Sequence, residues 1–511
     1  MPPLPRIRIL LFIAAALVWS SCSNYPPSNP TEPAIPQMTL IYPKSITNQT
    51  IFPLICADTA IQPRSAGKEW FQIYSSEAAF AGKPLKVKRG WGSVSDRIIG
   101  NGPRELSIIS PGGKTLLEIS VVVEAAPVIR PLSGLLSDEN LLWDSTAVIR
   151  VTGDLTIPEG STLHIEPGAR IEIHPLVNIY ARGSIHCKGD FDNPVLFGAA
   201  PLGGAGWGCI YHYSAEYDYQ YAIFISGGAD ESRRFGHSNS QPTLGGDGSR
   251  VSFNHVFILD NPGKAFGFAN SHVEIRRSLI NRCDTGGEFH TSQVIIEDCY
   301  FMDMPADDGI EVDDDNDALY LAGATGNLDT SLVKNTVFIT GKDDAIDHNG
   351  AIVRIVGCLI EGYDNEGVAA SNQNWCEVSN TLILNCEQGI EAGYGQPTVI
   401  VKHCTLVGNQ TGLRLGDWYY QNCLGEIIAT DVISYGNYLH NVWNWDLSLG
   451  GPRPRAITIG YSLVNTAEFD TCAGGLVGIP RFNSDWTLGL QSPGKSAGSD
   501  GRDLGIYAVG N

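Results

Sequence analysis

The fold is decided by six consecutive stretches of the chain, which repeat one pattern of short apolar runs and turns. They are HVEIRRSLINRCDTGGEFH (272–290), QVIIEDCYFMDMPADDGIEVD (293–313), LVKNTVFITGKDDAIDHNG (332–350), IVRIVGCLIEGYDNEGVAAS (352–371), WCEVSNTLILNCEQGIEAG (375–393) and TVIVKHCTLVGNQTGLRLG (398–416). A small residue anchors each copy, and successive anchors are 21, 37, 22, 23 and 23 residues apart. Such a period of short β-rich runs is typical of a solenoid, in which each repeat covers its neighbour's apolar face. We therefore expect an all-β solenoid with parallel rungs.

The solenoid is expected to span 135–511. Its opening, AVIRVTGDLTIPEGSTLHIEPGARIEIHPLVNIYARGSIHCKG (147–189), alternates with a period of two and is broken by Pro-Glu-Gly and Pro-Gly corners, as short strands are. The apolar alternation is lost near 203–249, which predicts a looped insertion. Residues 38–125 contain separate alternating runs divided by Gly and Pro turns, which predicts a small β-sandwich-like domain ahead of the solenoid.

The N-terminus has the pattern of an export signal. Arg6 and Arg8 precede an apolar run from Ile9 to Trp19, which is too short to span a membrane. Ser20-Ser21-Cys22 resembles a lipoprotein cleavage box, so we expect a signal peptide over 1–22 with Cys22 acylated, and then a Pro-rich linker over 23–37. This predicts an exported protein of the cell envelope, lipid-anchored on the periplasmic or outer surface, or alternatively secreted, with no other membrane contact.

Charge and cysteine content narrow the classes of partner. A net charge of −21 argues against nucleic acid. Twelve cysteines in an exported chain would suggest disulfides. However, the anchors Cys299, Cys358 and Cys404 lie at least two rungs apart, too far to bond at about 4.8 Å per rung. We expect a buried stack of small side chains instead.

The chain resembles the exported right-handed parallel β-helix repeat proteins of bacteria. The resemblance rests on the opening rungs GDLTIPEGSTLHIEPGARIEI (153–173), the six repeats, and the closing SPGKSAGSDGRDLG (492–505). It implies a right-handed parallel β-helix. That superfamily includes pectate, alginate and chondroitin lyases, polygalacturonases and adhesins, so the resemblance does not by itself choose a function.

Aligned repeats place acidic residues in three columns. The columns read Asp284, Asp307, Asp343, Asn365, Glu387, Gln410; then Thr285, Asp308, Asp344, Glu366, Gln388, Thr411; then Glu288, Glu311, Asp347, Ala369, Glu391, Arg414. At about 4.8 Å per rung these carboxylates would form an acidic wall. Two charges about 5 Å apart repel by about 3 kcal/mol at an effective dielectric of about 20, so such a wall requires a cation, raised pKa values or full exposure.

Calcium is the cation that such a wall would favour, because dense oxygen ligands suit Ca²⁺. Asp343-Asp344-Ala345-Ile346-Asp347 also resembles the calcium-binding DDxxD of family 9 pectate lyases, and 307–311 is a near copy. The expected ligands are Asp307, Asp308, Glu311, Asp343, Asp344 and Asp347. A solvated acidic face, or aspartates that simply form turns, is the alternative.

The expected function is binding of Ca²⁺ and an extended, acidic polysaccharide in a lateral groove, with cleavage by a lyase reaction as an open question. A lyase needs a cation and a basic residue, for which Lys342 and Arg414 are candidates beside Asp344. A hydrolase would instead use paired carboxylates. The candidate substrate-binding residues are His290, His348, Trp418 and Tyr419. The competing class is a non-catalytic surface protein for adhesion or glycan binding, with structural calcium.

Overall fold

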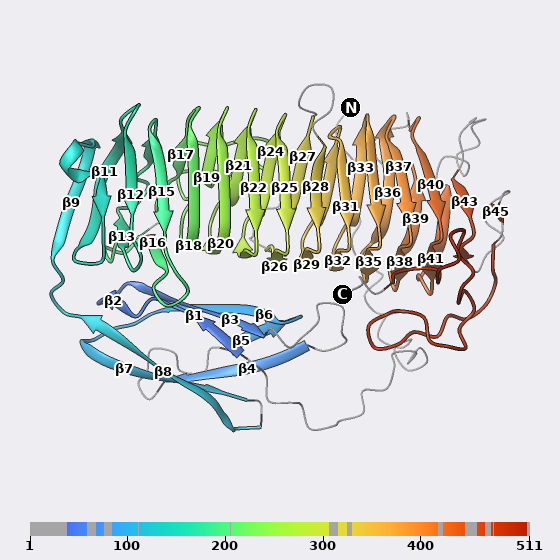
Figure 1. Ribbon diagram of the computed structural model, residues 1–511, viewed down its shortest axis with the longest axis horizontal. Coiled ribbons are helices and arrows are strands. Elements are labelled where there is room, and N and C mark those ends of the chain that lie inside the picture. The colour runs from blue at the N-terminus through green and yellow to red at the C-terminus, as the bar shows by residue number, and fades with distance from the viewer. Residues whose placement is uncertain are drawn as a thin grey trace, which may run out of the picture.

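The computed structural model describes residues 38–58, 68–75, 84–110, 112–204, 206–305, 315–323, 330–416, 423–444, 457–464, 472–473 and 475–507. Two β units are present: an eight-stranded sheet at the N-terminus and a long stack of parallel strands. Figure 1 shows the stack as a row of coils running along the long axis, with the N-terminal sheet lying against one side. None of the helices within these ranges is long and apolar enough to cross a membrane.

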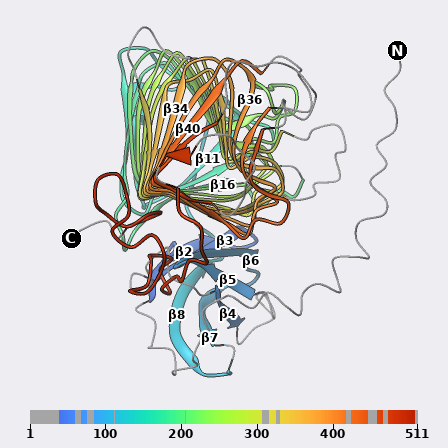
Figure 2. The same cartoon turned by 90° about the vertical axis from the view of Figure 1, so that its right-hand side faces the viewer.

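The stack is a parallel β-helix, which confirms the fold expected from the repeats. Each coil contributes one strand to each of three sheets, and every strand pairs in parallel with its counterpart in the next coil. Figure 2, which looks along the row of coils, shows the three faces. The stack starts at β9 (Ile129–Leu135), which pairs with β11, and a 3₁₀ turn, η3 (Asp138–Asn140), follows it.

The three sheets are named here by their order within a coil. Sheet I contains β10 (Leu142–Trp143), β12 (Thr162–Ile165), β15 (Ser184–Lys188), the first halves of β18 (Glu216–Ile225) and β20 (Arg250–Asn261), β22 (His272–Arg276), β25 (Gln293–Glu297), β28 (Ser331–Lys334), β31 (Val353–Val356), β34 (Trp375–Ser379), β37 (Thr398–Lys402), β40 (Glu426–Thr430), β43 (Thr458–Gly460) and β45 (Cys472–Ala473). Sheet II contains the first half of β11 (Val148–Ile157), β13 (Arg170–Ile173), β16 (Val195–Ala199), the second halves of β18 and β20, β23 (Leu279–Cys283), β26 (Tyr300–Met302), β29 (Val337–Gly341), β32 (Leu359–Tyr363), β35 (Leu382–Leu384), β38 (Thr405–Val407), β41 (Ile433–Tyr435) and β44 (Leu463–Val464). Sheet III contains the second half of β11, β14 (Ile179–Ala181), β17 (Ile210–His212), β19 (Pro242–Asp247), β21 (Lys264–Ala269), β24 (Gly287–His290), β27 (Leu319–Ala322), β30 (Ile346–Asn349), β33 (Glu366–Asn372), β36 (Gln388–Gly395), β39 (Thr411–Leu415) and β42 (His440–Asn444).

The anchor column forms the turn between sheets I and II. The residue before each anchor adopts positive φ, as at Asn335 (50°), Asn380 (46°) and His403 (49°), and the small anchor itself is buried. The anchor hydroxyl of Thr336 donates to a backbone carbonyl of its own turn, and the thiols of Cys358 and Cys404 do the same. All ten cysteines whose side chains are described are free and buried, which confirms the expectation of a small-residue stack.

The expected loop near 203–249 is mostly regular. Strands β17, β18 and β19 continue the stack through it, and residues 226–241 form the long connection between β18 and β19. The core of these coils contains His212, Tyr217 and Tyr219 in place of aliphatic residues, and His212 hydrogen-bonds the Tyr219 hydroxyl at 2.7 Å. Because aromatic and polar side chains fill this part of the core, the aliphatic rhythm disappears from the sequence although the coil does not.

The N-terminal unit is one sheet with the strand order β1-β3-β6-β5-β4-β7-β8-β2. Its strands are β1 (Met38–Ile41), β2 (Ser45–Thr47), β3 (Ile51–Asp58), β4 (Lys68–Ser75), β5 (Pro84–Lys88), β6 (Trp91–Arg97), β7 (Gly102–Ile109) and β8 (Thr115–Glu124). Its buried side chains form one cluster with those on the outer side of sheet II. The second layer that a sandwich requires is therefore supplied by the β-helix.

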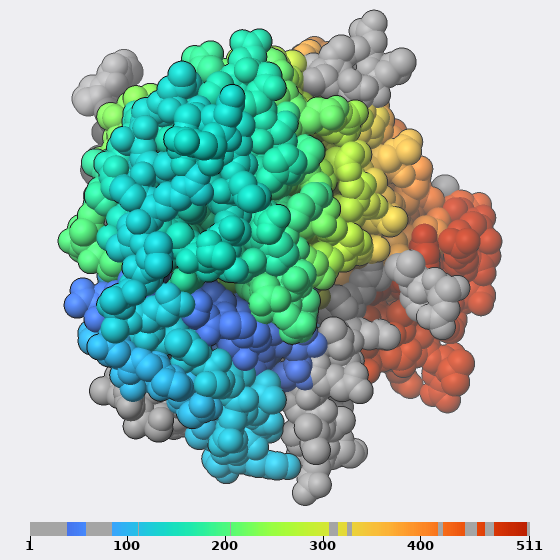
Figure 3. All heavy atoms as spheres, turned by 60° about the vertical axis from the view of Figure 1, so that its left-hand side comes forward, coloured from blue at the N-terminus to red at the C-terminus, as the bar shows by residue number. Residues whose placement is uncertain are grey.

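Aromatic and ionic contacts also join the N-terminal sheet to sheet II. The Trp91 ring lies 5.3 Å from that of Tyr300, and Arg89 pairs with Glu361 at 2.9 Å. Figure 3 shows the N-terminal unit packed directly beneath the first coils. With sheet II covered in this way, sheets I and III remain as the outer faces on which a site can lie.

Candidate functional site

A line of charged residues follows sheet III across consecutive coils. The strand register places Glu288, Tyr320, Asp347, Ala369, Glu391 and Arg414 opposite one another in that order. This is the third acidic column expected from the repeats, with one correction. Tyr320 of β27 occupies the place that the aligned repeats give to Glu311.

The turn that leads into sheet III carries the second column. Ala318 N donates to Asp344 O at 2.9 Å, and Ala345 N donates to Glu366 O at 3.0 Å, so Asp317, Asp344 and Glu366 hold equivalent places in successive coils. Asp317 therefore takes the position expected for Asp308. The second repeat contains two similar segments, 307–311 and 316–320, and the sequence could not show which one enters the sheet. Asp307, Asp308 and Glu311 lie outside the described residues.

Asp317, Asp343 and Asp344 form a compact carboxylate cluster. One oxygen from each lies within 4.8 Å of the others. Asp317 is 3% and Asp344 7% exposed, while Asp343 is half-buried. Backbone amides orient two of them: Asp344 N donates to Asp317 Oδ1 at 3.2 Å, and Glu366 N donates to Asp344 Oδ1 at 2.7 Å.

Burial and mutual repulsion both act on the protons of this cluster. The pKa of Asp317 is raised well above its ordinary value, first by desolvation and then by the charges of Asp343, Asp347 and Asp315. Desolvation and the neighbouring Glu366 carboxyl raise the pKa of Asp344 in the same way. A carboxylate that is costly to ionise in isolation is stabilised by a proton or by a cation.

Opposite charges pair at one end of the line. Lys264 and Glu288 are fully buried and form an ion pair, and Lys264 Nζ also donates to Phe235 O at 2.5 Å. His290 Nε2 lies 2.7 Å from Glu288 Oε1, and the amide of His237 donates to the same oxygen. Desolvation would raise the pKa of Glu288, but the bonds from His290, Lys264 and His237 lower it to about 2.

An aromatic layer connects this end to the carboxylate cluster. The His237 ring stacks on Tyr320 with centroids 4.9 Å apart, and its Nδ1 lies 3.3 Å from Asp315 Oδ2. The Tyr320 hydroxyl accepts a hydrogen bond from Asn349 at 2.7 Å. Sequence reasoning missed His237, because it comes from the 226–241 loop, where no periodicity marks its position.

Arg414 lies at the other end of the line and differs from its expected role. It is 3% exposed and forms ion pairs with Glu391 and, at 3.5 Å, with Glu366. A guanidinium held between two carboxylates is stabilised in its charged form, so this geometry does not suit a base that accepts a substrate proton. Lys342, the other candidate base, is half-buried beside Asp343.

The two candidate histidines do not share a face. His290 is outward and about a third exposed. His348 is completely buried, and its Nε2 bonds Ala351 O at 2.5 Å. His290 lies two residues after its column position Glu288, whereas His348 lies one residue after Asp347, and alternate side chains of a strand point to opposite faces. The structure therefore removes His348 from the substrate-binding residues; Trp418, Tyr419 and Cys22 lie outside the described residues.

Two adjoining depressions lie where the turns from sheet III lead into sheet I. Their volumes are about 580 and 220 Å³, and Glu216, Arg250 and His272 line both. In the larger depression most lining side chains are polar, and the turns 214–216, 248–250 and 270–272 lie side by side. A hollow of this kind was not expected on this face.

Comparisons with known proteins give no family for this chain. No family model and no curated protein matches it. Among solved structures, a tailspike protein of Escherichia coli bacteriophage HK620 is similar with 13% identity over 65% of this chain and 61% of the tailspike, at a TM-score of 0.33. The mannuronan C-5 epimerase AlgE4 A-module of Azotobacter vinelandii gives 9% identity over 60% of this chain and 91% of the module, at 0.24. The catalytic domain of a GH87 α-1,3-glucanase in complex with nigerose gives 9% over 80% and 88%, at 0.31. Likeness at these TM-scores carries no argument about function.

Proposed function

We propose that this protein binds an extended acidic polysaccharide along the outer side of sheet III, with Ca²⁺ held by Asp317, Asp343 and Asp344. The observation that supports the proposal is the convergence of these three carboxylates, two of them buried, within 4.8 Å. Ca²⁺ takes oxygen ligands at about 2.3–2.6 Å, so ligand oxygens on one ion lie up to about 5 Å apart. The cluster offers oxygen and no sulfur or nitrogen, which fits a hard cation.

A bound cation would also explain how a strongly acidic chain could attract a polyanion. The protein carries a net charge of −21, which repels uronate carboxylates at long range. Calcium, when bound, would neutralise a substrate carboxylate beside the cluster. The exposed His237 ring stacks on the buried Tyr320 ring, and its Nδ1 lies beside Asp315. The His237 ring therefore offers a flat surface of the kind that sugar rings stack on.

The residues of this chain that suit a lyase step are His290 and Glu288. Glu288 holds His290 Nε2 at 2.7 Å, so Nδ1 is the nitrogen left for a substrate, and the ring is about a third exposed. A buried carboxylate that orients an imidazole is a recurrent arrangement for a general base. In the proposed elimination, Nδ1 takes the C5 proton of a uronate, the C5–H electron pair forms the C4–C5 double bond, the C4–O bond breaks, and the leaving oxygen takes a proton from water.

Calcium binding is tested by calorimetry on the full chain after treatment with a chelator. We expect one saturable Ca²⁺ site that is lost in Asp343→Asn, while Asp298→Asn, in the opposite turn of a nearby coil, retains it. Unchanged binding in Asp343→Asn would remove the cluster as the site.

The chemical step is tested by the ultraviolet absorbance of unsaturated uronide products on pectate, alginate and glycosaminoglycans. If a substrate is found, His290→Gln should lower kcat at least 100-fold with little change in Ca²⁺ affinity, and the exposed control His164→Gln should not. Calcium-stabilised folding with no product from any polyuronide would favour the second candidate, a non-catalytic glycan-binding or adhesion protein. The burial of Asp317 and Asp344 is the observation that favours a structural ion.

Export and anchoring complete the proposal. Cys22 after the apolar run would carry the lipid, and the 23–37 linker would separate the membrane from the first β unit. Expression of the full chain with Cys22→Ser in a bacterial host tests this: the variant should leave the membrane fraction, and the unchanged chain should incorporate labelled fatty acid. A membrane-bound Cys22→Ser protein would contradict lipid anchoring.

A further inference from the structure

A second cluster of metal-binding side chains lies where the C-terminal segment returns to the β-helix. Residues 475–507 fold back along the turns between sheets I and II. Gly505 N donates to Asp431 O at 2.8 Å, Ile506 N donates to Thr405 Oγ1 at 3.0 Å, and Tyr507 N donates to Asn380 Oδ1 at 3.0 Å. Leu488 and Leu504 of this segment pack on apolar residues of β41 and β44.

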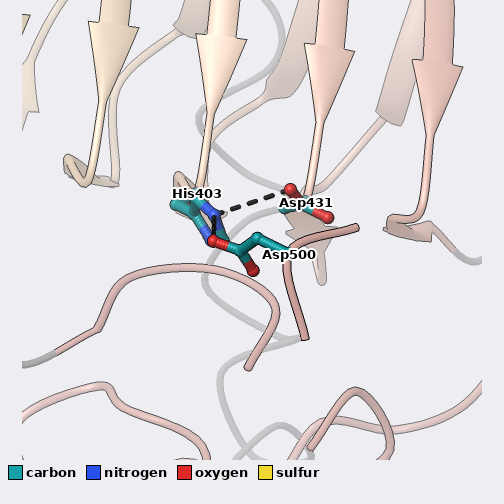
Figure 4. A group of neighbouring side chains, drawn as sticks. All are labelled: His403, Asp431 and Asp500. Atoms are coloured by element: carbon teal, nitrogen blue, oxygen red, sulfur yellow. Dashed lines mark hydrogen bonds and ion pairs between the residues drawn. The ribbon is translucent and has the colours of Figure 1, made fainter. Parts of the chain in front are cut away.

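The cluster consists of His403, Asp431 and Asp500. His403 follows β37 and Asp431 follows β40, at the same place in two consecutive coils, and Asp500 comes from the returning segment. His403 Nε2 lies 3.2 Å from Asp500 Oδ2 and 3.5 Å from Asp431 Oδ2 (Figure 4). One ligand atom from each of the three lies within 4.8 Å of the others.

Both carboxylates are held in place by groups outside the cluster centre. Ser499 donates to Asp431 through its amide (2.6 Å to Oδ1) and its hydroxyl (2.7 Å to Oδ2). The amide of Arg502 donates to Asp500 Oδ1 at 2.9 Å, which leaves Oδ2 facing the imidazole. Hydrogen bonds of this kind, made to the ligating groups, orient the ligands of metal sites.

The imidazole has its polar contacts on the cluster side. The His403 residue is 9% exposed, and its Nδ1 is buried without a hydrogen-bond partner in the described part of the chain. Nε2 points between the two carboxylates. Nε2 is therefore the ring nitrogen that is placed to bind a cation together with the two carboxylates.

We propose that His403, Asp431 and Asp500 bind a divalent transition-metal ion, of which Zn²⁺ is the best fit, and that this ion fastens the C-terminal segment to the β-helix. Tetrahedral ligands at about 2.0–2.1 Å from Zn²⁺ are about 3.4 Å apart. His403 Nε2 lies at similar separations from Asp500 Oδ2 (3.2 Å) and Asp431 Oδ2 (3.5 Å). One imidazole nitrogen and two carboxylate oxygens leave a fourth position for water. The ligand nitrogen distinguishes this site from the all-oxygen cluster on sheet III.

Zinc titration by calorimetry, on the full chain freed of metal, tests the proposal. Asp343→Asn is used as the background so that the sheet III cluster does not contribute. We expect one saturable Zn²⁺ site, weakened at least 10-fold by Asp500→Asn. The matched control is Asp485→Asn, because Asp485 lies in the same segment and likewise accepts a bond from the amide two residues on. The Asp500 side chain is 40% exposed, so its replacement should leave the fold intact.

Hydrogen exchange of residues 475–507 gives the second readout. Zinc should slow exchange of this segment in the background protein and leave it unchanged in the Asp500→Asn variant. Absence of saturable zinc binding, or equal binding in both proteins, would overturn the proposal and leave an imidazolium–carboxylate contact as the account of the cluster.

Discussion

Two acidic groups at sheet III, the Glu288 ion pair and the carboxylate cluster in the turn before the sheet, handle buried charge in opposite ways. In the first, the Glu288 carboxylate meets the Lys264 ammonium, and the pKa of Glu288 falls to about 2. One to two coils further along, Asp317 and Asp344 meet other carboxylates, and their pKa values rise well above the ordinary range. Both parts are buried to a similar degree.

The difference shows that burial alone does not set the state of a carboxyl group. A carboxylate with a buried cation and several donors stays ionised, whereas one that faces other carboxylates favours a proton or an external cation. The first arrangement is complete within the chain. The carboxylate cluster of Asp317, Asp343 and Asp344 contains no cation of its own to offset its charge. For that reason the proposed calcium site lies there.

The largest expected effect on stability comes from removing the Lys264–Glu288 ion pair. Glu288→Gln leaves Lys264 buried without its charge partner, which typically costs about 3–5 kcal/mol. Because the pKa of Glu288 is lowered to about 2, its stabilisation is present above about pH 4.5 and is lost as the pH falls towards 2. Urea denaturation at pH 7 should show a large loss for Glu288→Gln. The exposed control Glu159→Gln should change stability by less than about 0.5 kcal/mol. A loss of less than about 1 kcal/mol for Glu288→Gln would contradict the prediction and would mean that water or another group binds the Lys264 ammonium in the variant.

An intermediate effect of opposite sign is expected in the cluster of Asp317, Asp343 and Asp344. Asp344→Asn removes a charge but keeps an oxygen to accept the Glu366 amide, so without calcium at pH 8 it should stabilise the protein by about 1–3 kcal/mol. The raised pKa of Asp344 means that the folded chain holds a proton that the unfolded chain releases, so the stability of the unchanged protein should fall as pH rises above about 4. Thermal melting at pH 4 and pH 8 should show the gain only at pH 8.

Calcium should reverse the order of these two proteins. In saturating Ca²⁺ at pH 8 the unchanged chain gains binding energy that the Asp344→Asn variant loses, so its melting temperature should become the higher one. If Asp344→Asn remained the more stable protein in calcium, the cluster would not be a calcium site. The repulsion between its carboxylates would still explain the gain in stability without calcium.

The smallest effect is expected on sheet I, where charge pairs are exposed. Arg354 is 57% exposed and lies 3.8 Å from Glu377, with its guanidinium 5.5 Å from the Trp375 ring. Arg354→Ala should cost about 0.5 kcal/mol or less, and less still at high salt. Urea denaturation at low and high salt provides the measurement. A loss of stability as large as that of Glu288→Gln would show that the exposed pairs on sheet I contribute as much as the buried pair on sheet III.

The sequence predicted the position of a residue within its coil correctly where local pattern and coil register coincide. Asp343, Asp344 and Glu366 follow short, regular repeats, and the structure brings Asp344 and Glu366 into contact. The long second repeat was ambiguous, because 307–311 (DDGIE) and 316–320 (NDALY) both place an aspartate before an apolar pair. Only the pairing of Tyr320 with Glu288 and Asp347 decided which segment forms the strand.

Side-chain direction was a second source of error. His290 and His348 follow the same acidic column by two residues and by one, and this single step places one ring outside and the other in the core. His237 and Asp500 reach their clusters from a loop and from the C-terminal segment, and neither position carries a periodic signal.

The sequence by itself determined the parallel β-helix, its small-residue anchor column and the coils that carry the acidic groups, because all three follow from a repeat of about 22 residues read at β-strand spacing. Tertiary structure alone decided which charges are neutralised. Lys264 meets Glu288, Arg414 meets Glu366 and Glu391, and Asp317 meets Asp343 and Asp344, although these partners lie 23 to 48 residues apart. The physical reason is that a charge is stabilised by what lies within a few ångströms in space, and stacking the coils sets those neighbours.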